Sequence, residues 1–411
     1  SRTRFWNTAL LVVAIVVVDV YGIFYFVGGS PARYAIILLP LFLLCVVRGP
    51  LNRLTIRPPE LPDYLLLALL VYGGVGSTFG IVFGLTPNPA LPLFLPMVLG
   101  LLHLTTLGPV EEAEASVHLR RWVVLGCVYT AVATASALGL LELIGGGGAD
   151  PSTNVAGAAF AHEKAFFLCL ALTGAWLLKR RKLFVLLVAG ALLGFFTYPA
   201  ATYLVAAVVT VMTLVATGRR AGRARAWTMA ILCLLFFAFV VKEVTTDGPQ
   251  VSEGIGSRYF EAVGKSNNSE TRAELWGDAW DELKESPIVG SGFTRDLTLR
   301  VWLEGKRRSV PPHNDYLQLG MGGGLLGMGL LLGWVGTTNL YAHRRFRRVV
   351  SQGSSNCAML LRLLMVGYNS FFAIALLNPV LSRLGLSVTA MLLYAMIMTV
   401  RAPSVGAESG R

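Results

Sequence analysis

Long apolar runs follow one another along almost the whole chain, and they restrict its fold more than any other feature. A helix needs about 20 mostly apolar residues to cross the hydrocarbon core of a bilayer, and most of these runs approach that length. The twelve runs cover residues 8–27, 32–47, 62–82, 90–107, 122–144, 156–178, 183–197, 199–217, 227–241, 314–340, 356–377 and 385–400. Only 14% of the 411 residues are charged, which leaves no room for a large soluble domain. The sequence therefore predicts an all-α polytopic membrane protein with about 12 transmembrane helices.

The distribution of positive charge predicts the orientation of these helices. With both termini in the cytoplasm, 21 of the 35 lysines and arginines lie on the cytoplasmic side. That bias is typical of membrane proteins, so the net charge of +12 does not indicate a nucleic-acid partner. The predicted divisions are nine helices in 1–241, an extracytoplasmic loop at 242–312, three helices in 313–400 and a cytoplasmic tail at 401–411.

The extracytoplasmic loop contains one segment with helical periodicity, at residues 269–285. Arg272, Trp276, Trp280 and Leu283 fall on one face of that helix. We expect the helix to lie on the membrane surface with its tryptophans at the depth of the lipid headgroups. Taken alone, it is as consistent with a structural lid as with part of an active site.

Two motifs follow the predicted lid. The first is Gly290-x-Gly292-Phe293, and the second is His313-Asn314, nine residues and then Gly324-x-x-Gly327. With the upstream pair Arg272 and Trp276, they resemble the O-antigen ligase superfamily, which includes O-antigen polymerases and bacterial O-oligosaccharyltransferases. The resemblance implies a membrane glycosyltransferase of the GT-C type in the bacterial cytoplasmic membrane, with its active site on the outer face and no metal.

That resemblance assigns roles that the residue chemistry supports. A neutral imidazole at His313 can take a proton from a hydroxyl acceptor as a glycosidic bond forms, with Asn314 or Asp315 setting its tautomer. Arg272 can hold phosphate oxygens through its planar guanidinium, and Arg258 is a second candidate. The donor would be a glycan on a polyprenyl phosphate or diphosphate, and the acceptor a hydroxyl on a lipid or glycan. Trp276 is a further candidate for substrate binding.

Polar residues inside the predicted spans are a separate set of candidates. His162, Glu163 and Lys164 lie about 10 Å below the outer end of their span, where polar side chains are costly unless they line a cavity or contact another helix. The glycines at 320, 323, 324 and 327 form small-xxx-small pairs, which predict close helix packing. Arg362 and Asn369 are also within spans, without an assigned role.

One segment departs from the family pattern. Related proteins commonly carry Ser-Arg between spans seven and eight, where the arginine faces the donor diphosphate, whereas this chain reads Thr197-Tyr198-Pro199-Ala200-Ala201. Either Lys164 replaces the missing charge or the donor is a monophosphate. We favour Lys164.

Neither a metal site nor a cofactor site is indicated. The five histidines are widely spaced, HExxH is absent, and no nucleotide-binding motif occurs. Three alternatives to a ligase remain. The first two are a repeat-unit polymerase of the same superfamily and a transporter that uses the intramembrane charges. A scaffold without catalytic activity is a third.

Overall fold

The structure, a computed structural model, is mostly helical as predicted. It describes residues 58–85, 93–94, 96–98, 101, 109–137, 161–197, 200–218, 268–303, 306–378, 380–381 and 384–401. The elements are α3 (Leu61–Val82), α5 (Glu112–Ala137), α8 (Ala161–Leu177), α9 (Arg181–Thr197), α10 (Ala200–Ala216), α13 (Asn268–Glu285), β1 (Leu299–Leu303), β2 (Lys306–Val310), α14 (Asp315–Ser351), α15 (Ser355–Ile374) and α16 (Leu384–Thr399).

Among the described residues, α3, α14 and α15 are long and apolar enough to cross a membrane, and α8, α10 and α16 contain shorter apolar segments. These helices match runs that hydropathy had predicted. The runs at 8–27, 32–47 and 227–241 lie outside the described residues, as does most of 90–107. The chain is therefore a helical membrane protein, and the number of twelve spans stays a prediction.

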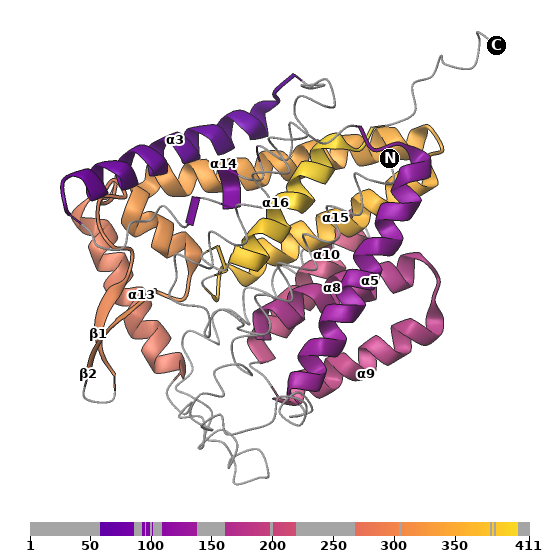
Figure 1. Ribbon diagram of the computed structural model, residues 1–411, viewed down its shortest axis with the longest axis horizontal. Coiled ribbons are helices and arrows are strands. Elements are labelled where there is room, and N and C mark those ends of the chain that lie inside the picture. Colours follow the sequence, from indigo (N-terminus) through magenta and orange to yellow (C-terminus); the bar gives the residue numbers. More distant parts are fainter. Residues whose placement is uncertain are drawn as a thin grey trace.

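The helices form one bundle, in which α13 and the antiparallel β1–β2 hairpin lie together at one end (Figure 1). At this end, called here the α13 end, α3 finishes and α14 begins.

The hairpin was not predicted, because its basic second strand lacks the alternation of a half-buried strand. α14 also continues past the predicted limit of 340, because hydropathy marks only the apolar part of a helix whose charged last turns remain helical.

The opposite end of the bundle is fastened by side chains that cap helices far away in the chain. Glu112, in the first turn of α5, accepts hydrogen bonds from the amides of Asn356 (2.7 Å) and Cys357 (3.1 Å). These amides belong to the first turn of α15, whose N–H groups have no partner within the helix. One carboxylate thus ties α5 to α15.

Two intramembrane residues without an assigned role have structural partners. Arg362 of α15 donates to the Thr217 carbonyl just after α10, and its guanidinium lies 5.0 Å from the centre of the Phe346 ring. Asn369 donates from Nδ2 to Thr213 Oγ1 at 3.1 Å. These contacts join α10 to α15, so both residues bridge two helices.

Candidate functional site

His313 stands immediately before the N-cap residue of α14, in a backbone conformation that is rare for a non-glycine residue. Its φ is 53°, and its side chain is half-buried. Asn314 then caps the helix, because its Oδ1 accepts hydrogen bonds from the amides of Tyr316 (3.0 Å) and Leu317 (3.1 Å). A non-glycine residue with positive φ just before a capped helix has a well-defined backbone geometry. That conformation costs about 1 kcal/mol or more of backbone strain. The chain therefore holds His313 outside the helix at a fixed turn.

Asp315 fastens this turn to the connection between α15 and α16. Its Oδ2 accepts hydrogen bonds from the amides of Val380 and Leu381, both at 2.8 Å, and its own amide donates to the Ala375 carbonyl at 2.9 Å. The residue is fully buried. Asn314 and Asp315 were the two residues expected to orient the imidazole. One side-chain oxygen of each accepts hydrogen bonds from backbone amides instead: those of the first turn of α14 for Asn314, and those of the α15–α16 connection for Asp315.

α13 packs across the start of α14 through a face of small and aliphatic side chains. Leu275, Ala279 and Leu283 are buried there, and the first two contact Met321 of α14 and Leu299 of β1. The placement of Trp276 and Trp280 at the membrane surface stays a prediction, with Trp280 50% exposed. What the prediction missed is a second face, with Leu275 and Ala279, that is buried against protein. The reason is that the hairpin and the start of α14 supply a protein surface that periodicity alone cannot reveal.

Trp276 extends the contacts of α13 to two further helices. Its ring packs against Val205 of α10, Ala373 of α15 and Leu377 after α15. Its Nε1 is buried and has no hydrogen-bond partner among the described residues. Arg272 lies one turn earlier in the same helix, where the structure describes only the backbone. α10, α13, α14 and α15 therefore meet at the α13 end, next to His313.

α14 is broken at Gly324, and a loop of residues 287–294 fills the break. Gly324 has φ 59° and ψ −157°, which only glycine adopts without strain. A Cβ at this position would lie 2.4 Å from the carbonyl carbon of Ile288. The glycines were predicted to bring two helices together. Cβ atoms on Gly323, Gly324 and Gly327 would instead meet this loop, called here the inserted loop, whereas one on Gly320 would lie 3.6 Å from Leu283 of α13.

Phe293 is the central side chain of the inserted loop. It is fully buried, with φ 61°, and its ring lies where the Cβ atoms of Gly322 and Gly323 would otherwise project. Tyr72 of α3 lies edge-on to this ring at a centroid distance of 5.4 Å and donates its hydroxyl to the Val289 carbonyl at 2.7 Å. Gly290-x-Gly292-Phe293 is thus a packing motif.

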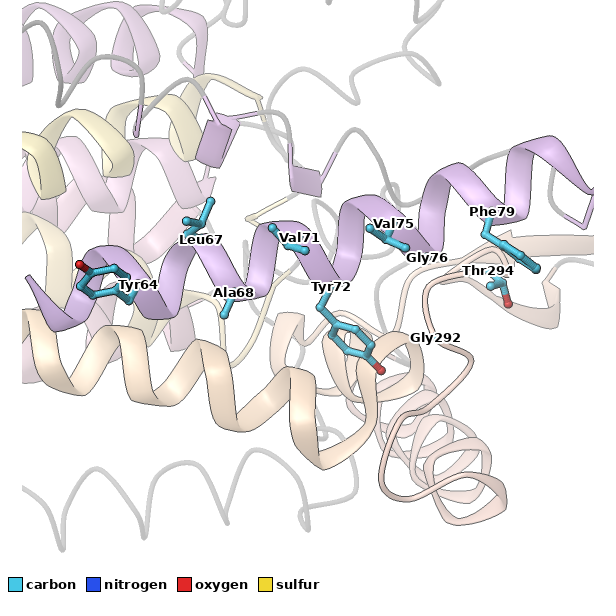
Figure 2. A pocket seen from close by; sticks show the side chains of 10 residues that line it. All are labelled: Tyr64, Leu67, Ala68, Val71, Tyr72, Val75, Gly76, Phe79, Gly292 and Thr294. Atoms are coloured by element: carbon cyan, nitrogen blue, oxygen red, sulfur yellow. The ribbon is translucent and has the colours of Figure 1, made fainter. Parts of the chain in front are cut away.

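An apolar groove of about 750 Å³ runs along α3. Figure 2 shows that its lining extends from Tyr64 to Phe79 on α3 and ends at Gly292 and Thr294 of the inserted loop. The sequence did not point to this contact, although Gly76 and Gly80 are spaced by one helical turn in the run at 62–82. The one-turn spacing of these glycines is the sequence signal that could have indicated a close contact on this face of α3.

The intramembrane candidates are only partly described. Lys164 lies in the first turn of α8 and is 1% exposed. Because α8, α9 and α10 alternate in direction through short connections, Lys164 is at the same end of the bundle as the start of α10. The side chains of His162 and Glu163, and all of Arg258, lie outside the described residues. In the described part of the chain, no three His, Cys, Asp or Glu side chains are grouped to hold a metal ion.

Comparison with known proteins confirms the resemblance drawn from the motifs. Residues 185–332 match the family model described as O-antigen ligase. The matched range contains α10, α13, the inserted loop and His313, whereas Lys164 precedes it. No curated protein matches the chain.

Proposed function

We propose that this chain, whose residues 185–332 carry the O-antigen ligase pattern, transfers a glycan from a polyprenyl phosphate or diphosphate to a hydroxyl acceptor. The family match supports a ligase-like or polymerase-like enzyme that uses lipid-linked glycans. The observation that carries the finer assignment is the position of His313. It is held outside α14 at the end of the bundle where the helix that carries Arg272 packs against three other helices.

The proposed reaction is a single displacement at the anomeric carbon of the donor. His313 takes the proton from the acceptor hydroxyl while the oxygen forms the new bond to that carbon. The bond between the carbon and the phosphate oxygen breaks, and the departing phosphate keeps the electron pair. Arg272, with Arg258 as a second candidate, stabilises the negative charge that develops on this phosphate. The acceptor proton leaves His313 for solvent after transfer.

We further propose that the α13 end faces the outside of the bacterial cytoplasmic membrane. The positively charged loops predicted to be cytoplasmic support this orientation, because residues such as Arg345 and Arg348 lie in the last turns of α14, at the opposite end. An extracytoplasmic site also fits the chemistry, because the donor is already activated and no nucleotide cofactor is needed. Single-cysteine labelling at Ser269 by an impermeant reagent tests this orientation.

The test of the function is a deletion strain carrying wild-type or variant protein. We expect lipid-linked glycan to accumulate in the deletion strain and in the strain with His313→Ala, since a general base contributes about 10²- to 10⁴-fold. His343→Ala, at the far end of the same helix, is the matched control and should restore processing. If His313→Ala also restores it while inserting normally, His313 has no part in the mechanism.

The accumulating lipid-linked species also separates a ligase from a polymerase. Loss of a ligase leaves finished glycan on its carrier, whereas loss of a repeat-unit polymerase leaves single repeat units. A strain without any such species, combined with substrate uptake by vesicles that hold the protein, would instead support a transporter.

A further inference from the structure

The inserted loop lies deeper than the outer end of the helix it contacts. Gly76 of α3 is six residues from the end of the helix at Val82, which is about 9 Å at 1.5 Å per residue. A Cβ on Gly76 would overlap the Gly292 carbonyl oxygen, and one on Gly80 would lie 2.7 Å from that of Thr294. α3 is a candidate membrane span. The loop therefore reaches well into one half of a hydrocarbon core about 30 Å thick.

Irregular backbone at that depth is tolerated where its polar groups are satisfied by protein or where it lines a water-filled cavity. The two broken ends of α14 provide the partners. The amides of Ser291 and Phe293 donate to the carbonyls of Met321 (2.9 Å) and Gly322 (2.8 Å). In return, the amides of Leu325 and Leu326 donate to the carbonyls of Pro287 (2.8 Å) and Ile288 (3.1 Å). The loop and the break satisfy each other's backbone groups.

The break divides α14 into two parts that no continuous helical ladder connects. Residues 315–323 form the first part, which begins two positions after His313. Asp315 anchors its start to the α15–α16 connection, and Phe293 holds its last turn through both its amide and its ring. The same loop begins two residues after Glu285, the last residue of α13. The loop thus connects the helix that carries Arg272 to the part of α14 that follows His313.

We propose that residues 287–294 form a re-entrant loop within the outer leaflet and that Phe293 is a positioning residue for His313. The positioning role rests on the function proposed above, whereas the membrane depth does not. Phe293 acts by fixing residues 315–323 against α13, so that the imidazole and the guanidinium keep one relative geometry.

The depth is tested by spin labelling of Ile288. The protein leaves 69% of this side chain uncovered, so lipid is what would shield it from water. In vesicles of phosphatidylethanolamine and phosphatidylglycerol, a nitroxide at Ile288→Cys should collide often with oxygen and rarely with a water-soluble nickel chelate. A nitroxide at Ser309→Cys, an exposed position on β2, should show the reverse. Equal accessibility of both labels to the nickel chelate would overturn the re-entrant assignment.

The positioning role is tested with Phe293→Leu, which stays apolar but loses the ring. With lipid-linked glycan extracted from the deletion strain as donor, kcat should fall roughly 10- to 100-fold at unchanged KM, because small misplacement of a catalytic group is costly. The pH dependence of kcat should also change, which a mere loss of folded protein would not cause. Phe83→Leu, at an exposed position after α3, is the matched control and should behave as wild type.

The outcomes distinguish this proposal from the function it rests on. If His313→Ala is inactive but Phe293→Leu matches Phe83→Leu, positioning by Phe293 is wrong and the function stands. If KM rises at unchanged kcat, Phe293 serves substrate binding and the positioning role is again wrong. If His313→Ala is as active as wild type, the proposed function itself fails, while the spin-label result still decides the depth.

Discussion

Arg345 of α14 contacts both carboxylate oxygens of Glu60, the residue that precedes α3, through a single nitrogen. The distances from Nη2 are 2.9 Å to Oε1 and 3.1 Å to Oε2. The other nitrogen, Nη1, donates to the carbonyls of Met398 (2.7 Å) and Val400 (3.1 Å) at the end of α16. One guanidinium therefore joins α3, α14 and α16 at the end of the bundle opposite α13.

Replacing Arg345 with lysine should destabilise the protein although the charge is kept. A lysine has one nitrogen and cannot reach the carboxylate and the α16 carbonyls as two separate donors. We expect the free energy of unfolding to fall by about 1.5 to 3 kcal/mol, the range for hydrogen bonds to charged groups. Thermal unfolding in detergent measures this, with the exposed Arg347→Lys as control. Equal melting temperatures for both variants would show that the contacts contribute little.

Gly324→Ala should be strongly destabilising. The backbone conformation alone costs about 1 to 3 kcal/mol for a residue with a side chain. The added Cβ would also overlap the backbone of Ile288 and the inserted loop. Gly329→Ala is the control in the same helix, because nothing lies within 4 Å of its Cβ position and alanine favours helix by about 1 kcal/mol. A melting temperature of Gly324→Ala at or above that of Gly329→Ala would refute the broken helix.

Protonation of Glu112 at acid pH should lower the stability of the fold. Burial raises the pKa of Glu112, but hydrogen bonds from Ser354 and from the amides of Asn356 and Cys357 outweigh this, so its pKa is below the ordinary 4.5. A lowered folded-state pKa means that the ionised group stabilises the fold at neutral pH, and that this contribution is lost as pH falls below about 4.5 through the folded value. The melting-temperature difference between wild type and Glu112→Gln should be constant above that pH and shrink below it. A constant difference throughout would exclude the linkage.

Arg272→Lys should lower the rate of transfer by about tenfold or more. Lysine keeps the charge but loses the planar fork that holds two phosphate oxygens, and one charge-assisted hydrogen bond is worth about 1.5 to 3 kcal/mol. The measurement is turnover of extracted lipid-linked glycan, with the exposed Arg300→Lys as control. Wild-type turnover by Arg272→Lys would mean that the position supplies diffuse charge or none.

Lys164→Met decides between the two kinds of donor. If Lys164 replaces the arginine missing from the segment at 197–201, the variant should lose transfer from a polyprenyl diphosphate donor more than from a monophosphate donor. Lys182→Met, exposed at the start of α9, serves as control. Undiminished transfer from the diphosphate donor would remove Lys164 from the site and favour the monophosphate.

Hydropathy and motif spacing predicted much of this molecule because both depend on local pattern. Apolar runs predicted the helices near Leu61–Val82 and Ser355–Ile374, and periodicity predicted the helix at Asn268–Glu285. The motif around His313 pointed to the family whose model matches residues 185–332. The roles of His313 and Arg272 remain proposals.

The sequence by itself determined that the chain is a helical membrane protein, because burial of apolar helices in lipid depends on composition and length alone. Tertiary structure decided which side chains meet. It turned Leu275 and Ala279 of α13 toward the protein and placed Phe293 on the glycines of α14. In the folded chain, Gly324 also breaks a helix that hydropathy predicts as continuous. These features depend on backbone conformation and on partners from about 20 to more than 200 residues away, such as Ala279 with Leu299 or Tyr72 with Val289, and no local pattern in one sequence contains that information.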